Sequence, residues 1–200
     1  MNIFFLIGHG GSGKSLYASS VAEHCQDSKR EIISYDEDDK VAQVAGYNSF
    51  VELLKNENSI QPFYNQYIKK LKDEASLNKD KVFIVSTGGF SILIDETLYE
   101  NGYKIYIKSS LADILRSVEE RLAKGIQFSV IKGFDSIPKD LEFKEFETNL
   151  FLEYYHKADL FYTQKMDLLI KNNHHDRELF KENIKIITKY INKKEEHNGI

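Results

Sequence analysis

The sequence predicts a three-layer α/β/α fold built on a five-stranded parallel sheet. Short apolar runs alternate with longer segments of helical period, which is typical of helices packed on both faces of a parallel sheet. A glycine-rich turn follows the first apolar run directly. The chain has 200 residues, of which 42% are hydrophobic, enough to bury one core without disulfides or metals.

Five short apolar runs are predicted strands. The first and third are rich in β-branched and aromatic residues, as strands buried on both faces are. The ranges are Ile3–Ile7, Ile32–Tyr35, Val82–Ser86, Lys104–Ile107 and Leu160–Tyr162.

Apolar residues at helical spacing predict five helices. The His174-His175-Asp176 run is expected to start the last helix, capped by Asp176, rather than to bind a metal. One domain is predicted over residues 1–191, with a frayed polar tail at 192–200. The helices are predicted at Lys14–Cys25, Tyr64–Leu77, Leu111–Lys124, Leu141–Lys157 and Arg177–Ile191.

Composition excludes several classes of protein. The formal net charge of −4 argues against a nucleic-acid binder that works by bulk charge. No run approaches the roughly 20 apolar residues of a membrane span. The single cysteine, Cys25, permits neither an intramolecular disulfide nor a cysteine-based zinc site. We therefore expect a cytoplasmic protein without nucleic-acid or membrane partners.

The turn after the first strand reads GHGGSGKS from Gly8 to Ser15 and fits the P-loop pattern G-x-x-x-x-G-K-[ST]. Glycines let successive N–H groups point at phosphate oxygens, and the following helix adds its partial positive charge. Lys14 is expected to reach the β- and γ-phosphates, and Ser15 to ligate Mg²⁺. The predicted nucleotide-binding residues are Gly8, Gly10, Gly11, Ser12, Gly13, Lys14, Ser15 and Leu16.

The same glycines also fit a second pattern. Gly8, Gly10 and Gly13 satisfy G-x-G-x-x-G, and Asp36 lies where a dinucleotide-binding fold places its ribose-binding acid. That pattern does not require Lys14 and Ser15, whereas the P-loop does. The P-loop interpretation is favoured, and a dinucleotide-dependent oxidoreductase stays as an alternative.

Five motifs in series resemble the shikimate kinases and related small P-loop kinases. The matches cover about residues 2 to 162 in the order of the family's own motifs. They are residues 2–15, the Asp36-Glu37-Asp38 segment, the Ser86-Thr87-Gly88-Gly89-Phe90 turn, Arg116 after the fourth strand, and Tyr155-His156-Lys157-Ala158-Asp159.

The resemblance implies a P-loop kinase fold, ATP and Mg²⁺ as cofactors, and a small-molecule acceptor. Asp36 would hold Mg²⁺ together with Ser15, and Asp38 would orient the acceptor hydroxyl. Arg116 would contact the adenine. Backbone N–H groups of Gly88 and Gly89 would approach the substrate. One carboxylate near the metal and one near the hydroxyl suit phosphoryl transfer, which depends on alignment and charge neutralisation.

The sequence departs from this family where the family clamps the shikimate carboxylate with arginines. Phe63-Tyr64 stands at one arginine position, Phe151 at another, and Phe90 replaces the third glycine of the turn. Tyrosine and phenylalanine cannot replace a bidentate arginine. We therefore expect an acceptor other than shikimate, bound by Asp38, Phe63, Tyr64, Gly88, Gly89 and Phe90.

Residues Gly125–Lys139 are predicted to form a lid that excludes water during transfer. Lys132 is the candidate there for contacting the transferred phosphoryl group. Two alternatives stay open: a nucleotide-binding homologue without transferase activity, and a shikimate kinase with a diverged pocket. The sequence leaves both a monomer and a homodimer open.

Overall fold

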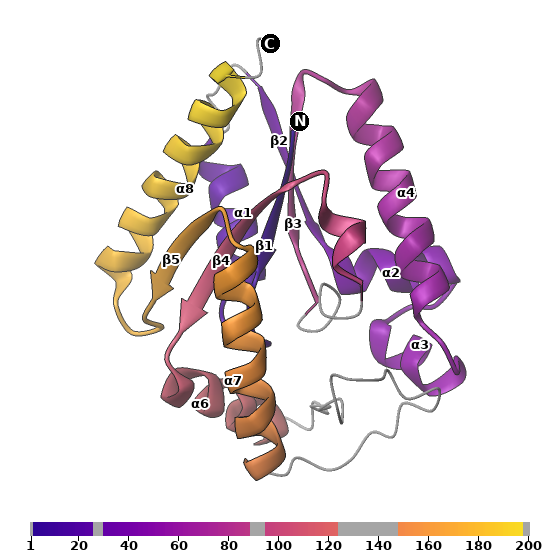
Figure 1. The fold of residues 1–200 in the computed structure, drawn as a ribbon, viewed down its shortest axis with the longest axis vertical. Helices are drawn as coiled ribbons and strands as arrows, with labels where there is room; N and C mark the ends of the chain where they lie inside the picture. Colours follow the sequence, from indigo (N-terminus) through magenta and orange to yellow (C-terminus); the bar gives the residue numbers. More distant parts are fainter. Residues whose placement is uncertain (1, 26–29, 89–94, 124–147, 198–200) are drawn as a thin grey trace.

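The computed structural model describes residues 2–25, 30–88, 95–123 and 148–197. Its five strands pair in parallel in the order β2-β3-β1-β4-β5, with helices on both faces (Figure 1). The predicted three-layer α/β/α class is confirmed. The strands are β1 (Ile3–Ile7), β2 (Glu31–Asp36), β3 (Lys81–Ser86), β4 (Tyr103–Ser109) and β5 (Leu168–Asn172).

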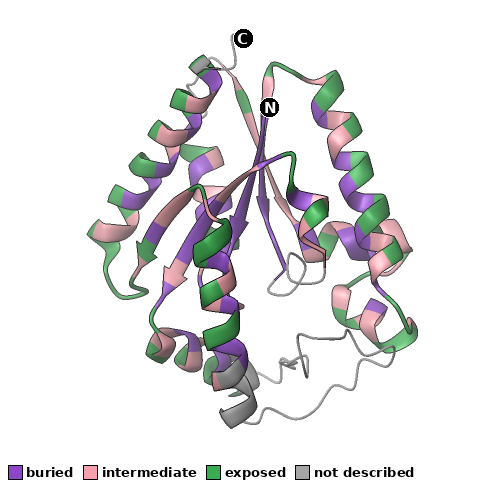
Figure 2. Ribbon diagram, in the orientation of Figure 1, coloured by how far each residue is buried: buried purple, intermediate pink, exposed green. Residues whose placement is uncertain are grey.

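Alternate residues of β1 belong to the two cores. Phe4 and Leu6 pack with helices α1 (Lys14–His24) and α8 (Arg177–His197). Ile3, Phe5 and Ile7 face the opposite layer. All five side chains are buried (Figure 2), as expected for the central strand of a parallel sheet. The opposite layer contains α2 (Glu37–Ala45), α3 (Phe50–Asn56), α4 (Gln61–Leu77), η1 (Glu96–Tyr99), α6 (Leu111–Ala123) and α7 (Thr148–Lys165).

The prediction of the fifth strand is wrong. Residues Leu160–Tyr162 lie within α7, and the strand is β5, which begins six residues after Tyr162. Tyr162 is fully buried, but Leu160 is 61% exposed. The three apolar residues therefore point to different sides of a helix. They do not form a buried strand.

Helix α8 also extends past its predicted end. It continues beyond Ile191 to His197, and Glu195 on its last turns is buried and forms an ion pair with Arg30. The tail from residue 192 is thus helical through His197. The predicted cap of α8 is confirmed: Asp176 Oδ1 accepts a hydrogen bond from the Leu179 N–H at 2.9 Å.

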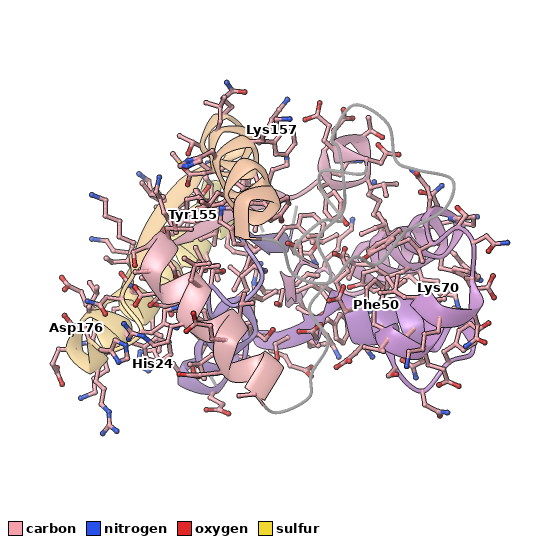
Figure 3. The ribbon with its side chains drawn as sticks, turned by 90° about the horizontal axis from the view of Figure 1, so that it is seen from below. His24, Phe50, Lys70, Tyr155, Lys157 and Asp176 are labelled. Atoms are coloured by element: carbon pink, nitrogen blue, oxygen red, sulfur yellow. The ribbon has the colours of Figure 1, made fainter. Side chains whose placement is uncertain are left out.

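The carboxyl ends of the parallel strands share one edge of the sheet, where ligands bind in folds of this type. Figure 3 views the molecule from below, with Phe50 and Lys70 on one side and Tyr155 of α7 on the other.

Within the described ranges, no helix is long and apolar enough to cross a membrane.

Candidate nucleotide and acceptor site

The loop between β1 and α1 has the conformation of a phosphate cradle. Gly13 occupies the N-cap of α1 with a φ of +90°, which L side chains rarely adopt. A Cβ on Gly8 would lie 2.6 Å from the Ile107 carbonyl oxygen, so β4 leaves no room for a side chain there. The first N–H groups of α1 therefore face the loop without a side-chain cap, as an anion site requires.

Lys14 and Ser12 lie inside this loop. The Lys14 ammonium donates hydrogen bonds to the carbonyl oxygens of Gly8 and His9, both at 2.8 Å. Ser12 is fully buried, and its Oγ has no hydrogen-bond partner among the described residues. A buried hydroxyl without a partner is unfavourable, and a phosphate oxygen in the loop would satisfy it.

The two predicted metal ligands meet beside this loop. Ser15 Oγ donates a hydrogen bond to Asp36 Oδ2 at 2.6 Å and lies 2.9 Å from Ser86 Oγ. Mg²⁺ prefers oxygen ligands and keeps waters and substrate phosphates in its shell. This hydroxyl and carboxylate therefore fit a magnesium nucleotide. No cluster of three His, Cys, Asp or Glu side chains that could hold a metal occurs in the described ranges.

Asp38 and Tyr64, which the sequence predicts to bind the acceptor, lie in contact with each other. Tyr64 Oη donates a hydrogen bond to Asp38 Oδ1 at 3.4 Å, joining α4 to α2. Desolvation, and then the neighbouring Asp36, raise the pKa of Asp38 to about 6. Burial raises the pKa of Tyr64 well above its usual value. The tyrosine therefore stays protonated, and Asp38 is a carboxylate whose charge changes near neutral pH.

Glu37 is a site residue that the sequence reasoning missed. Its carboxylate is fully buried, with Oε2 accepting from the Gly88 N–H at 2.8 Å and Oε1 accepting from the Tyr99 hydroxyl at 2.6 Å. The Gly88 N–H is therefore held by Glu37, whereas the family resemblance places it against the substrate. The acidic run is visible in the sequence, but the burial of its middle member depends on η1 and on the turn after β3.

Gly88 is nevertheless close to Asp38 and Tyr64. A Cβ added to Gly88 would lie 2.5 Å from Asp38 Oδ1 and 3.2 Å from Tyr64 Oη. The position therefore has to be glycine for Asp38 to lie against the turn after β3. Phe63 is half-buried next to Tyr64 and packs against the same core.

The opposite side of the loop is formed by α6 and by the turn after β5. Arg116 lies on α6, and its guanidinium contacts His175 at the surface. His174 Nε2 lies 3.1 Å from Ser109 Oγ. The structure therefore brings the histidine pair, which the sequence indicates only as a helix start, beside the predicted adenine-contacting arginine. Leu16 is 59% exposed on α1.

His9 packs the loop between β1 and α1 against α7. Its imidazole is fully buried and stacks on Tyr155 at 4.3 Å between ring centroids, with Tyr154 and Tyr162 edge-on. Burial, and then Lys14, lower the pKa of His9 to about 3. The ring is therefore a neutral packing element of the loop.

Several predicted positions lie outside the described residues: Gly89, Phe90, Lys132 and the segment Gly125–Lys139. The side chain of Phe151 is likewise not described. Asp159 of the matched α7 motif accepts hydrogen bonds from the Tyr106 hydroxyl and, at 2.9 Å, from the Lys108 ammonium. This carboxylate therefore ties α7 to β4.

Comparison with solved structures finds the same fold in P-loop kinases. A shikimate kinase from Bacteroides thetaiotaomicron superposes with a TM-score of 0.62 at 17% identity, over 95% of this chain and 98% of that one. The shikimate kinase from Acinetobacter baumannii, in complex with shikimate, gives 0.62 at 15% identity, over 97% and 95%. The APS kinase of Mycobacterium tuberculosis, in complex with AMPPNP and APS, gives 0.51 at 14%, over 93% and 95%.

No family model and no curated protein matches the sequence. At these identities the structural likeness shows a shared fold. It confirms the predicted three-layer fold, which this chain shares with the shikimate kinases and the APS kinase.

Proposed function

We propose that this chain is an ATP-dependent kinase that transfers the γ-phosphoryl group to a hydroxyl of a small metabolite. The main support is the Ser15–Asp36 contact of 2.6 Å beside the phosphate loop. It puts a hydroxyl and a carboxylate where a magnesium nucleotide needs ligands. The sheet order argues against the dinucleotide alternative, because β1 pairs with β3 here, whereas a dinucleotide-binding fold places its second strand beside the first.

Each residue has a separate role in this reaction. The N–H groups at the start of α1 and the Lys14 ammonium bind and orient the phosphates. Ser15 and Asp36 would hold Mg²⁺, which supplies charge neutralisation on the transferring group. Asp38 orients the acceptor hydroxyl and takes up its proton at a carboxylate oxygen, while the Tyr64 hydroxyl holds that carboxylate in place.

The acceptor in this proposal is not shikimate. Tyr64, which stands at the position of a carboxylate-clamping arginine in the family that the sequence resembles, donates to Asp38 instead. A tyrosine hydroxyl donates one hydrogen bond and carries no positive charge, so it cannot replace a guanidinium against a substrate carboxylate. A polyol or a ring-bearing alcohol suits this side of the site better.

The test is ATP consumption by the purified chain with Mg²⁺, measured against a panel of hydroxylated metabolites that includes shikimate. We expect acceptor-stimulated turnover with an uncharged alcohol. Asp38→Asn is expected to lower kcat by about 100-fold or more. Asp39→Asn, on the exposed neighbouring carboxylate, is the matched control and is expected to retain turnover.

Three results would contradict the proposal in different ways. ATP binding without turnover for any acceptor would indicate a nucleotide-binding homologue without transferase activity. Efficient turnover of shikimate at micromolar levels would indicate a shikimate kinase with a diverged pocket. Binding of NAD in place of magnesium-ATP would restore the oxidoreductase alternative.

A further inference from the structure

A pocket lies apart from the phosphate loop, between α2 and α4 on the side of the edge strand β2. Its volume is about 290 Å³, near the lower end of the range for small-molecule sites. Tyr64 of α4 faces Asp38, whereas Tyr67, one helical turn further on, lines this pocket. Figure 1 shows α2 and α4 side by side beyond β2.

The charged groups of the pocket favour an anion. Lys40 of α2 and Lys70 of α4 approach it from the two helices, and Glu74 is its single carboxylate among the described residues. The Tyr35 hydroxyl donates to that carboxylate at 3.0 Å. The Lys40 ammonium lies 4.6 Å from the centre of the Tyr35 ring, a contact that holds it at the pocket wall.

Tyr67 contributes to the wall of the pocket. Tyr67 is 4% exposed, and its hydroxyl has no hydrogen-bond partner within the described part of the chain. Burial raises the pKa of Tyr67 well above its usual value, so the hydroxyl keeps its proton. The hydroxyl oxygen is closed to groups the size of water, so a ligand in the pocket would meet the wall of the pocket and not this oxygen. The side chains of Val44 and Leu71 supply apolar lining.

We propose that this pocket binds a small organic carboxylate. Its charge would lie toward Lys40 and Lys70, and its apolar body would rest on Val44 and Leu71. Such a ligand would join α2 to α4, the two helices that carry Asp38 and Tyr64. The pocket is therefore an effector site next to the acceptor side, and its occupancy does not depend on turnover.

The experiment is an NMR titration of the full chain with benzoate as the probe, following backbone amides of α2 and α4. We expect saturable shifts at the pocket residues. Lys40→Gln and Lys70→Gln should each weaken benzoate binding about threefold, as expected for partly solvated charges. Lys69→Gln removes an exposed lysine of the same helix that does not line the pocket, and it should leave the affinity unchanged.

Two further probes separate the contributions of charge and apolar body. Benzyl alcohol has the ring without the charge, and inorganic phosphate has charge without the ring, so each should bind more weakly than benzoate. The proposal is overturned if benzoate gives no saturable shifts in α2 and α4, or if Lys69→Gln weakens it as much as Lys70→Gln. It is also overturned if either of the other probes matches benzoate. Thermal melting of each variant verifies that it is folded.

Discussion

Replacing Asp38 by asparagine should stabilise the protein at pH 8 while removing its turnover. The pKa of this carboxyl is raised from 3.8 to about 6, so the folded chain holds the ionised form less well than the unfolded chain does. Each pKa unit corresponds to about 1.4 kcal/mol, and the difference of about two units therefore costs about 3 kcal/mol of folding free energy once both states are ionised. Because Asp38 is only half-buried, solvent screening reduces the expected cost to about 2 kcal/mol.

The sign of this effect depends on pH. A carboxyl whose folded pKa is raised destabilises the fold above that pKa, and the penalty disappears as pH falls through the window from about 6 to 3.8, because the folded state takes up the proton first. The asparagine side chain of the variant carries no charge in either state. The advantage of Asp38→Asn should therefore be largest above pH 7 and small near pH 4.

The assay is urea unfolding of both proteins at pH 4 and pH 8, without nucleotide or Mg²⁺, since a bound cation would favour the ionised carboxylate. Asp39→Asn provides the control for removing one negative charge from α2. Equal unfolding free energies of wild type and Asp38→Asn at pH 8 would refute the reasoning, as would a gain equal to that of the control. A gain that persists undiminished at pH 4 would show that it does not come from ionisation.

The packing supports three further predictions. Gly8→Ala places a methyl group against the Ile107 carbonyl, and nucleotide binding measured by calorimetry should be lost or weakened more than tenfold, with overpacking costing about 1–3 kcal/mol of stability. Glu37→Gln can accept only one of its two hydrogen bonds in the same geometry, and urea unfolding should show a loss of about 1–3 kcal/mol. Truncation after Ile191 removes the buried partner Glu195, and thermal melting should show a lower Tm, whereas a fraying tail would leave Tm unchanged.

The amino-terminal part of the site was predictable because its signals are local. The run Ile3–Ile7, the glycines and the Lys14-Ser15 pair specify strand, loop and helix start within 13 residues. The place of Asp36 followed from the rule that parallel strands end at one edge of the sheet, and its pairing with Ser15 was implied by the resemblance to the shikimate kinases. Neither inference required knowledge of distant packing.

The errors arose where tertiary contacts determine the secondary structure or the burial of a residue. In α7 the buried residues Tyr154, Tyr155, Ala158 and Tyr162 recur at helical spacing, and this signal outweighs three consecutive apolar residues. β5 was missed because Lys171 and Asn172 make it look polar, as edge strands often do. The role of Glu37 required the position of Tyr99, 62 residues away, which no local pattern contains.

The stacking of His9 has a consequence for how the reaction responds to acidity. With a pKa of about 3, the imidazole contributes no charge in neutral or mildly acidic solution, so its side chain leaves the electric field around bound phosphates constant. In the protein without nucleotide or Mg²⁺, Asp38 changes its charge inside that range. Acidification should therefore reduce the ability of Asp38 to take up the proton of the acceptor hydroxyl. His9 stays neutral over the same range and leaves nucleotide binding unaltered.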